Sequence, residues 1–570
     1  MSSSVEKVSE PRGVLRRSRA VGGSALLAGG AAGSTLLMSL FASPVGAVTT
    51  FTVDTNADGV ANASDCVTPV ASSCSLRDAL AAANTDGDVI VFDGAMSGQT
   101  ISLSQGQLIV TAGITITGLG SANLTVDAGG YSRVFYIEPA GTPSADVVFS
   151  GLSIINGDAP GDNGGGIYDM HDGDFTLNDV SITGCDASYG GAVYKDSDGD
   201  IEIVDSTISD NHAMINSGAL YNNGVGDLII TNSIFDGNVA GSGGVGQIGN
   251  DGNVTIVGST FSNNYADGSG GVFYITSDVT GDVSISGSSF VGNEATDGGG
   301  AIYTKNDGSL TVTSSTFSGN ISDDWGGALY LGTTGQVVSV TDSLFADNYA
   351  STSGGAIDSD ANDQIVTINN STFVGNSSGS SGGAIWKNEG GSLTINMSTI
   401  TENSAASGGG VYFEATYAGQ ADVTITGTIL TGNTGNGGVA DDLNTQIEPY
   451  LPVATISDSV LGVVDADITV TASNNIDATA PGFVLGLAAL ADNGGTTETM
   501  ALLTGSPAID AGPATVPTFT GNGFDQRGTP YVRVYNGQSD IGAFELQPDP
   551  TPVTTTTVAS DESVVPTFTG

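Results

Sequence analysis

Two stretches decide the fold: Val283–Tyr303, which reads VSISGSSFVGNEATDGGGAIY, and Leu310–Tyr330, which reads LTVTSSTFSGNISDDWGGALY. They repeat one pattern with an offset of 27 residues. The pattern holds a short alternating strand, a Ser/Thr-aromatic block that ends in Asn, and a Gly-Gly-Ala-aliphatic block that ends in an aromatic residue. A fixed period of this length is typical of solenoids, whose units bury an apolar face only by stacking on their neighbours.

The same pattern recurs between about residues 150 and 435, and each period holds three short strands separated by turns. We therefore predict an all-β fold, a single-stranded right-handed parallel β-helix of the pectin-lyase-like type, in which each strand pairs with its equivalent in the next coil. A helical solenoid would need longer helical runs in each repeat, and a propeller blade needs about forty residues.

Stacked coils align equivalent residues in columns, so the Asn that ends the second block should form a ladder. Amide-to-amide hydrogen bonds along the axis would satisfy polar groups that cost about 1–3 kcal/mol each when buried without a partner. Cys185 lies 26 residues before the first Asn, so we interpret it as a small buried substitute in the same column and not as a reactive thiol. The predicted ladder comprises Asn211, Asn238, Asn264, Asn293, Asn320, Asn348, Asn376, Asn403 and Asn433.

The Gly-Gly block predicts a second column, on the outside. Its penultimate residue is apolar in nine of ten copies and should point inward, so the terminal aromatic residue should point outward. Gln247 and Asp358 interrupt this aromatic column. The rings either stack on sugars or pack on one another and shield the sheet, and we favour packing. The candidate glycan-binding residues are Tyr274, Tyr303, Tyr330 and Trp386.

Both ends of the chain differ from the repeats. Residues 1–47 combine five of the 12 basic residues, an apolar stretch and small residues, which predicts a secretory signal peptide. Residues 547–570 are Pro/Thr-rich and predict a disordered tail. Without the leader, seven basic and 59 acidic residues remain, a balance that argues against nucleic acid and anionic lipid as partners. No later stretch has the roughly 20 apolar residues of a membrane helix, so no membrane span is predicted in the mature chain.

Residues 48–100 should form an N-terminal cap. Ser75 and Asp78 have the spacing of a capping box, which predicts a short helix over the first coil. Export predicts a disulfide between Cys66 and Cys74. Asp54, Asn56 and Asp58 have the oxygen-ligand spacing of a calcium loop without its downstream Glu, so Ca²⁺ is the one cofactor considered. The alternative, which we favour, is a solvated Asp/Asn turn.

Several motifs resemble known families. Cys74–Leu80 (CSLRDAL) resembles the CSLREA-type segment found before bacterial β-helix repeats, and Leu124–Glu138 resembles the first coils of that family. The Gly-Gly-Ala-aliphatic and FxxN blocks are similar to repeats of chlamydial polymorphic outer-membrane proteins, which are surface adhesins. Gly505–Gly512, Asp525–Gly528 and Asp540–Glu545 resemble the choice-of-anchor Q C-terminal region. The resemblance implies an extracellular protein and no reaction, with β-helix repeats over 101–440 and C-terminal coils plus an anchor-like region over 441–546.

The residues give little support for catalysis. Lys195, Lys305 and Lys387 lie three or four coils apart, too far to hold one uronate carboxylate. We interpret His171 and His212 as solvated turn residues, and no catalytic residue is assigned. We therefore predict a secreted or cell-surface protein with an adhesive or structural role, for which an extracellular glycan or surface component is the candidate partner. The alternative is a carbohydrate-active enzyme, a polysaccharide lyase or glycoside hydrolase, on the same scaffold. The sequence does not indicate an oligomeric state.

Overall fold

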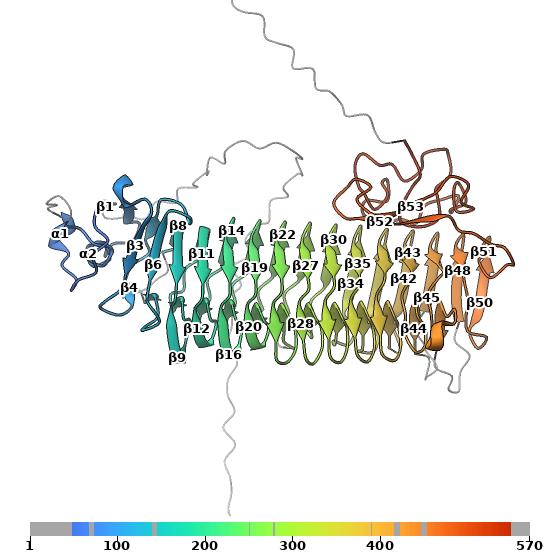
Figure 1. Ribbon diagram of the computed structural model, residues 1–570, viewed down its shortest axis with the longest axis horizontal. Coiled ribbons are helices and arrows are strands. Elements are labelled where there is room, and N and C mark those ends of the chain that lie inside the picture. The colour runs from blue at the N-terminus through green and yellow to red at the C-terminus, as the bar shows by residue number, and fades with distance from the viewer. Residues whose placement is uncertain are drawn as a thin grey trace, which may run out of the picture. The chain divides into compact units, whose positions relative to one another are not determined.

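The computed structural model describes residues 48–67, 73–138, 145–249, 251–277, 280–388, 390–414, 422–445 and 453–548. The predicted signal peptide (1–47) and all but the first two residues of the predicted tail (547–570) lie outside these residues. The described chain is a parallel β-solenoid, as the repeats predict (Figure 1).

Three parallel sheets run along the solenoid. In the described residues, sheet A has 29 strands, sheet B has 13 and sheet C has nine. The strands of sheet B are β4 (Leu108–Val110), β7 (Phe135–Ile137), β10 (Ile167–Asp169), β13 (Val193–Lys195), β17 (Leu220–Asn222), β21 (Gly246–Ile248), β25 (Phe273–Ile275), β29 (Ile302–Thr304), β33 (Leu329–Leu331), β37 (Ile357–Ser359), β41 (Ile385–Lys387), β44 (Val411–Phe413) and β47 (Leu443–Thr445). The strands of sheet C are β9 (Asp158–Asn163), β12 (Asp186–Tyr189), β16 (His212–Asn216), β20 (Val239–Ser242), β24 (Tyr265–Ala266), β28 (Glu294–Ala295), β32 (Ile321–Ser322), β36 (Tyr349–Ala350) and β40 (Ser377–Ser378).

Sheet A usually receives two strands from each coil. A residue with positive φ, such as Ser314 at 49°, bends the chain between them. The strands of sheet A are β1 (Thr50–Val53), β2 (Val89–Phe92), β3 (Gln99–Ser102), β5 (Thr115–Thr117), β6 (Leu124–Asp127), β8 (Val147–Ile155), β11 (Phe175–Thr183), β14 (Ile201–Val204), β15 (Thr207–Ser209), β18 (Leu228–Thr231), β19 (Ile234–Asp236), β22 (Val254–Val257), β23 (Thr260–Ser262), β26 (Val283–Ser286), β27 (Ser289–Val291), β30 (Leu310–Thr313), β31 (Thr316–Ser318), β34 (Val337–Thr341), β35 (Leu344–Ala346), β38 (Ile365–Asn369), β39 (Thr372–Val374), β42 (Ser392–Asn396), β43 (Thr399–Thr401), β45 (Asp422–Thr426), β46 (Ile429–Leu430), β48 (Val453–Ser457), β49 (Val460–Leu461), β50 (Thr469–Ser473) and β51 (Ile476–Asp477).

The Asn ladder fills one corner of the interior. Nδ2 of Asn293 donates to Oδ1 of Asn320 at 2.9 Å and to the carbonyl of Phe261 at 3.0 Å. The same contacts repeat from Asn211 to Asn433, where the last amide donates to Asp442 at 2.8 Å. At the other end, the buried backbone N–H of Cys185 donates to Oδ1 of Asn211. Every amide is therefore satisfied inside the stack, and burial raises the pKa of the Cys185 thiol to about 12, which makes it inert.

A second polar ladder, which the sequence analysis did not predict, lies a few residues before each Asn. The backbone N–H of Ser259 donates to the hydroxyl of Ser288, and the backbone N–H of Ser288 donates to the hydroxyl of Ser315, both at 3.2 Å. Its members are Ser206, Ser233, Ser259, Ser288, Ser315, Ser343, Ser371, Ser398, Thr428 and Ser459. Between the two ladders a column of buried Phe rings stacks at 4.6–5.1 Å from Phe235 to Phe373. These columns fill one side of a core that also contains the inward-facing Val, Ile and Leu residues of sheets A and B.

The Gly-Gly pair recurs for two separate reasons. Gly299 has a φ of +66°, which residues with a side chain rarely adopt. A Cβ on Gly300 would lie 2.1 Å from the carbonyl oxygen of Gly327 in the next coil. The first Gly turns the chain into sheet B, and the second lets two coils approach.

Short helices and a disulfide cover the N-terminal end. The helix α2 (Leu76–Ala82) has the predicted capping box between Ser75 and Asp78, and it buries Leu76, Ala79 and Leu80. The shorter α1 (Ser64–Val67) precedes it, and the Cys66–Cys74 disulfide joins the two segments. Two 3-10 helices, η1 (Gly94–Met96) and η2 (Asn436–Gly438), lie in connections.

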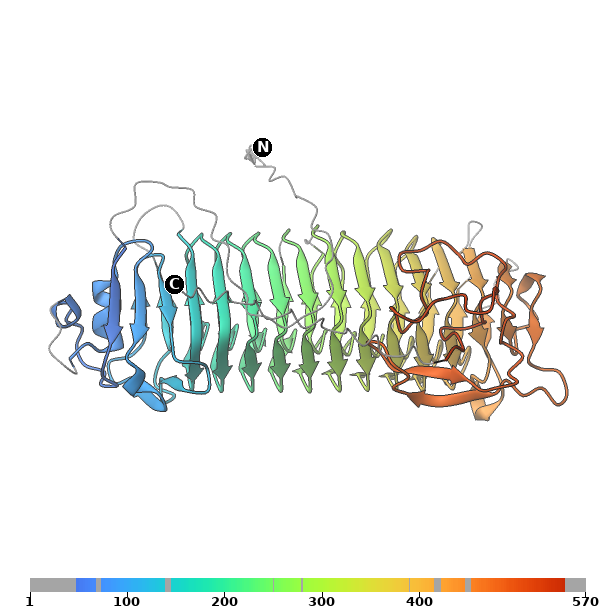
Figure 2. The same ribbon diagram turned by 90° about the horizontal axis from the view of Figure 1, so that it is seen from above.

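The C-terminal region does not continue the stack. The coils end at β51, and residues 480–546, which we call the C-terminal lobe, turn back onto the outer face of sheet A. Figures 1 and 2 show the lobe in red beside the yellow and orange coils. The lobe contains the antiparallel pair β52 (Leu487–Ala491) and β53 (Thr499–Leu502). Met500 packs with Leu344, Ala346 and Val374 of sheet A.

Candidate functional site

The aromatic column lies on the outer face of sheet B, with one residue from each of nine strands. We call it the aromatic strip. Register pairs Tyr274 with Tyr303 and Tyr303 with Tyr330, so the rings follow one another along the axis. The strip comprises Tyr136, Tyr168, Tyr194, Tyr221, Tyr274, Tyr303, Tyr330, Trp386 and Tyr412. Tyr136 is an addition to the predicted set, and its ring lies 5.5 Å from that of Tyr168.

The strip points outward, but four of its nine rings, those of Tyr194, Tyr303, Tyr330 and Tyr412, are buried. Tyr303 and Tyr330 are only 7% and 6% exposed, whereas Tyr274 and Trp386 are half-buried. Tyr303 and Tyr330 stack with their centroids 4.5 Å apart and their planes 13° apart. This pair agrees with the favoured interpretation of the column, in which the rings pack on one another and shield the sheet.

Neighbouring loops complete the cover. The loop from sheet C to sheet B brings Gly298 against the Tyr303 ring and places the Trp325 ring 6.0 Å from that of Tyr330. On the other side, the ammonium group of Lys305 lies 5.0 Å from the centroid of Tyr303. Of the four candidate glycan-binding residues, only Tyr274 and Trp386 keep substantial accessible surface.

Asp358 interrupts the strip between Tyr330 and Trp386. Its carboxyl group is fully buried, and its Oδ2 accepts a hydrogen bond of 2.5 Å from the hydroxyl of Ser353. Its Oδ1 has no hydrogen-bond partner within the described residues. Burial raises the pKa of Asp358 well above 3.8, and the nearby Asp360 adds to the shift. The carboxyl is consequently held in its neutral form over a wide pH range.

Asp360, the acidic neighbour of Asp358, is hydrogen-bonded to a tyrosine of the strip. The hydroxyl of Tyr330 donates to Asp360 at 2.7 Å, and burial raises the pKa of Tyr330. At the other interruption, Nδ2 of Asn216 donates to Oε1 of Gln247 at 2.5 Å. Both interruptions are therefore polar positions held by their own hydrogen bonds.

The three residues with calcium-loop spacing, Asp54, Asn56 and Asp58, bond to other parts of the cap in the structure. Asp58 forms an ion pair of 2.7 Å with Arg77 and accepts backbone N–H bonds from Ser104 and Gln105. Asp54 accepts from the backbone N–H of Cys74 at 2.9 Å, and Asn56 donates across to the next coil. Arg77 thus holds the carboxylate that a cation would need. No cluster of three or more metal-ligating side chains occurs in the part of the chain that the structure describes.

The histidines behave differently from each other. His212 is exposed and lies 2.6 Å from Asp186, in keeping with a solvated turn residue. His171 is only 3% exposed and contacts Asp169 at 2.5 Å, so its interpretation as a solvated residue is wrong. The Asp-rich turn around it suggested solvent, but Asp169 is an inward-facing strand residue that draws the ring into the interior.

Lys195 and Lys387 are also inside. Both are fully buried at inward-facing positions of sheet B, whereas Lys305 lies outside on the strip. Of these three lysines, Lys305 is therefore the one whose side chain lies on the outer face of sheet B.

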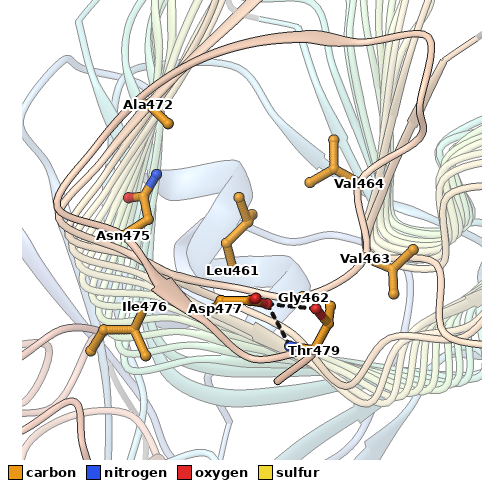
Figure 3. Close-up of a pocket in the computed structure, with 9 residues that line it drawn as sticks. All are labelled: Leu461, Gly462, Val463, Val464, Ala472, Asn475, Ile476, Asp477 and Thr479. Atoms are coloured by element: carbon orange, nitrogen blue, oxygen red, sulfur yellow. Dashed lines mark hydrogen bonds between the residues drawn. The ribbon is translucent and has the colours of Figure 1, made fainter. Parts of the chain in front are cut away.

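A pocket of about 390 Å³ marks the C-terminal end of the coils. Figure 3 shows its side chains around the last coil, formed by β49, β50 and β51. The lining is largely apolar, with Leu461, Val464 and Ile476, and Asp477 accepts from Thr479. This pocket is the unfilled end of the solenoid core, and the described residues around it form no catalytic arrangement of carboxylates.

Carboxylates with raised pKa values gather instead under the C-terminal lobe. Burial raises the pKa of Asp342 and of Glu545 to about 7 each. Glu545 accepts backbone N–H bonds from Tyr535 and Asp540, and Asp342 accepts from the amide of Asn370. The bonds of Glu545 stay within the lobe, whereas Asp342 lies under the lobe, where Thr497 donates to its backbone carbonyl.

Comparisons with known proteins agree with the repeat architecture. The Chlamydia polymorphic membrane protein repeat profile matches residues 287–305, 314–332 and 370–387. No curated protein matches the chain. Among the solved structures that resemble it is a mannuronic acid specific polysaccharide family 6 lyase from human gut microbiota, with 12% identity over 75% of this chain and 91% of that chain and a TM-score of 0.37. Another is the pectate lyase Pel9A, with 14% identity over 88% of this chain and 98% of that chain and a TM-score of 0.26. At such low identities and TM-scores, the lyases carry no argument about activity.

The structure also bears on membrane insertion. Among the described residues, no helix has both the length and the apolar character required to cross a bilayer.

Proposed function

We propose that the protein is an adhesin-like β-solenoid that acts at the cell surface or after secretion. The match of three coils to the polymorphic membrane protein repeat carries this proposal. Those coils contain the Asn, Ser and Phe columns that define the stack, so the likeness extends to the way the coils are built. The CSLREA-type and choice-of-anchor Q resemblances and the predicted leader support an extracellular location.

The proposed ligand is an extracellular glycan that contacts the accessible part of the aromatic strip. Trp386 and Tyr274 supply the half-buried rings on which a sugar can stack. They lie in β41 and β25, four strands apart in sheet B, so a linear polymer that follows the axis can reach both. Tyr303 and Tyr330, which stack on each other and are covered, lie on the strip between Tyr274 and Trp386.

A glycan array with the full chain tests this proposal. Trp386→Ala and Tyr274→Ala should weaken binding about tenfold or more, and Tyr349→Ala should not. Tyr349 is the matched control because it is 40% exposed and lies on sheet C. Equal binding by all variants would contradict the strip as the binding surface. Release of reducing sugar from a bound polysaccharide would support the carbohydrate-active enzyme instead.

A further inference from the structure

A buried Asp–Lys pair joins two neighbouring coils inside the solenoid. Asp169 and Lys195 are register partners at the inward-facing third positions of β10 and β13. Both side chains are fully buried. Nζ of Lys195 lies 3.1 Å from Oδ2 of Asp169.

Further hydrogen bonds hold the side chains of Asp169 and Lys195 in place. Nζ of Lys195 also donates to the backbone carbonyls of His171 at 2.8 Å and Gly173 at 3.0 Å. Nδ1 of His171 lies 2.5 Å from Oδ1 of Asp169, so the ring and the amine hold opposite oxygens of one carboxyl group. Nε2 of His171 is buried and has no partner within the described residues. A basic nitrogen without a partner in a dry interior is costly for a purely structural histidine.

Burial favours a neutral product over this ion pair. Two charges removed from water cost more than most ion pairs recover, and an amide carries no charge. Water, which would hydrolyse an amide or compete with the amine, is excluded from the site because neither side chain is exposed. The amine is also held against the carboxyl group, which replaces a bimolecular encounter by a unimolecular one.

We propose that Lys195 and Asp169 condense to an isopeptide bond that links two coils covalently. The ammonium group passes one proton to Oδ2, and the resulting amine attacks Cγ of the neutral carboxyl. His171 Nδ1–H donates to Oδ1 as charge develops there. A proton then moves from the nitrogen to the leaving hydroxyl, the C–O bond breaks, and one water molecule leaves as the C–N bond of the amide is completed. No oxidant, reductant or cofactor is consumed.

Lys387 provides a matched control in the same interior column. It is equally buried, but its Nζ donates to the carbonyls of Asn388 at 2.8 Å and Gly390 at 2.9 Å, and its register partners are Ser359 and Phe413. No carboxyl group among the described residues bonds its amine. Lys387 should therefore remain a free amine.

Mass spectrometry of the full chain tests the proposal. After reduction of the disulfide and digestion with trypsin and chymotrypsin, which cuts after Phe175 between the two residues, Lys195 and Asp169 should occur in one joined pair of peptides lighter by the mass of one water. Trypsin should fail to cut after Lys195 but cut after Lys387. Separate, unmodified peptides that contain Asp169 and Lys195, recovered from the folded protein, would overturn the proposal.

Single-residue variants distinguish loss of the isopeptide bond from loss of the fold. Lys387→Met should keep the joined peptides, and Lys195→Met and Asp169→Ala should lose them. Because the last two can impair folding, His171→Gln is the informative variant: it should slow cross-link formation at least tenfold in a time course of freshly folded protein. An unchanged rate would overturn the role of His171, and a joined peptide in Asp169→Ala would overturn the assignment of the carboxyl group.

Discussion

At the scale of single residues, the stability of the solenoid depends on side-chain amides that are satisfied in both directions. Asn320 donates to Asn348 at 2.9 Å and to the carbonyl of Phe290 at 3.0 Å, and it accepts from Asn293. Two of these bonds join Asn320 to the preceding coil and one joins it to the following coil. Loss of one amide therefore leaves unsatisfied groups in both neighbouring coils at once.

Asn320→Ala should lower the free energy of unfolding by about 2–4 kcal/mol, because it strands a buried amide and a buried carbonyl. Urea denaturation followed by the fluorescence of Trp325 and Trp386 measures the change. Asn223→Ala, at an exposed amide that bonds Asp196, is the control and should cost less than about 0.5 kcal/mol. Equal losses in the two variants would contradict the structural role of the ladder.

Asp358 predicts an unusual response to pH. Its folded pKa is raised, so its contribution to stability is largest below its unfolded pKa and is lost as the pH rises toward the folded pKa. Asp358→Asn should therefore stabilise the protein by about 1 kcal/mol or more at pH 8 and have little effect near pH 4. Denaturation curves at the two pH values measure the difference, and a variant that is less stable at pH 8 would contradict the prediction.

The residues that the sequence predicted well are those whose position follows from the period alone. The Asn ladder and the buried place of Cys185 depend only on which residues share a column. The cover over Tyr303 and the burial of His171 depend on how loops fold back over a sheet, which strand alternation does not describe. The serine ladder was readable in principle, since a Ser or Thr precedes each aromatic block at a constant offset.

At the scale of elements, the docking of the C-terminal lobe explains an irregularity in sheet A. In the second strand that each coil adds to sheet A, the outward-facing residues are Thr207 and Ser209 in β15 but Leu344 and Ala346 in β35. Ile234 and Val291 are apolar residues at equivalent positions and are exposed, whereas Leu344 and Ala346 are buried because Met500 of the lobe packs on them. Polar contacts complete the interface: Oγ1 of Thr372 donates to Oε1 of Gln526 at 2.6 Å, and the guanidinium of Arg533 bonds Oδ1 of Asn370 at 3.0 Å.

Leu344→Ser should loosen the lobe without unwinding the coils, because serine is the kind of residue that other coils carry at this position. The expected result is faster proteolysis within residues 480–546, with the Trp fluorescence transition shifted by less than about 1 kcal/mol. Thr207→Ser, at the equivalent position outside the interface, is the control. Unchanged proteolysis of the lobe in Leu344→Ser would contradict this account of the interface.

The lobe should also respond to pH. Asp342 lies under the lobe and burial raises its pKa to about 7, so the docked state retains a proton that the undocked state would release. Docking should be strongest near pH 4 and weaken by about 2 kcal/mol as the pH rises to about 7, with little change above it. Hydrogen-exchange protection of the lobe, corrected for the pH dependence of intrinsic exchange, should fall over this range, and Asp342→Asn should flatten the curve. Protection that rises with pH would contradict the prediction.

At the scale of the whole molecule, charge is the dominant feature outside the core. The chain carries 61 acidic and 12 basic residues, and its net charge is −49. Several of the basic residues are internal, such as Lys195, Lys387 and Arg533, and do not offset the acidic surface. Repulsion among the surface carboxylates therefore opposes the folded state.

Salt should consequently stabilise the protein. Raising sodium chloride from about 0.05 M to about 1 M shortens the screening length from over 10 Å to about 3 Å and should raise the midpoint of thermal unfolding by several degrees. Thermal unfolding followed by circular dichroism at the minimum of the β-sheet signal measures the shift of the midpoint. A midpoint that falls with salt would indicate that ion pairs outweigh the repulsion.

The direction of the Asn ladder has a consequence for how the chain tolerates changes of length. Every side-chain amide donates toward the next coil, and the series closes on the carboxylate of Asp442, which only accepts. Such a one-way chain can gain or lose links anywhere between its first and last members, provided that each link is a complete turn of the backbone. Duplication or deletion of whole repeats therefore offers a route to longer or shorter relatives, whereas an insertion of three residues ahead of a block would place its phenylalanine where an amide is required.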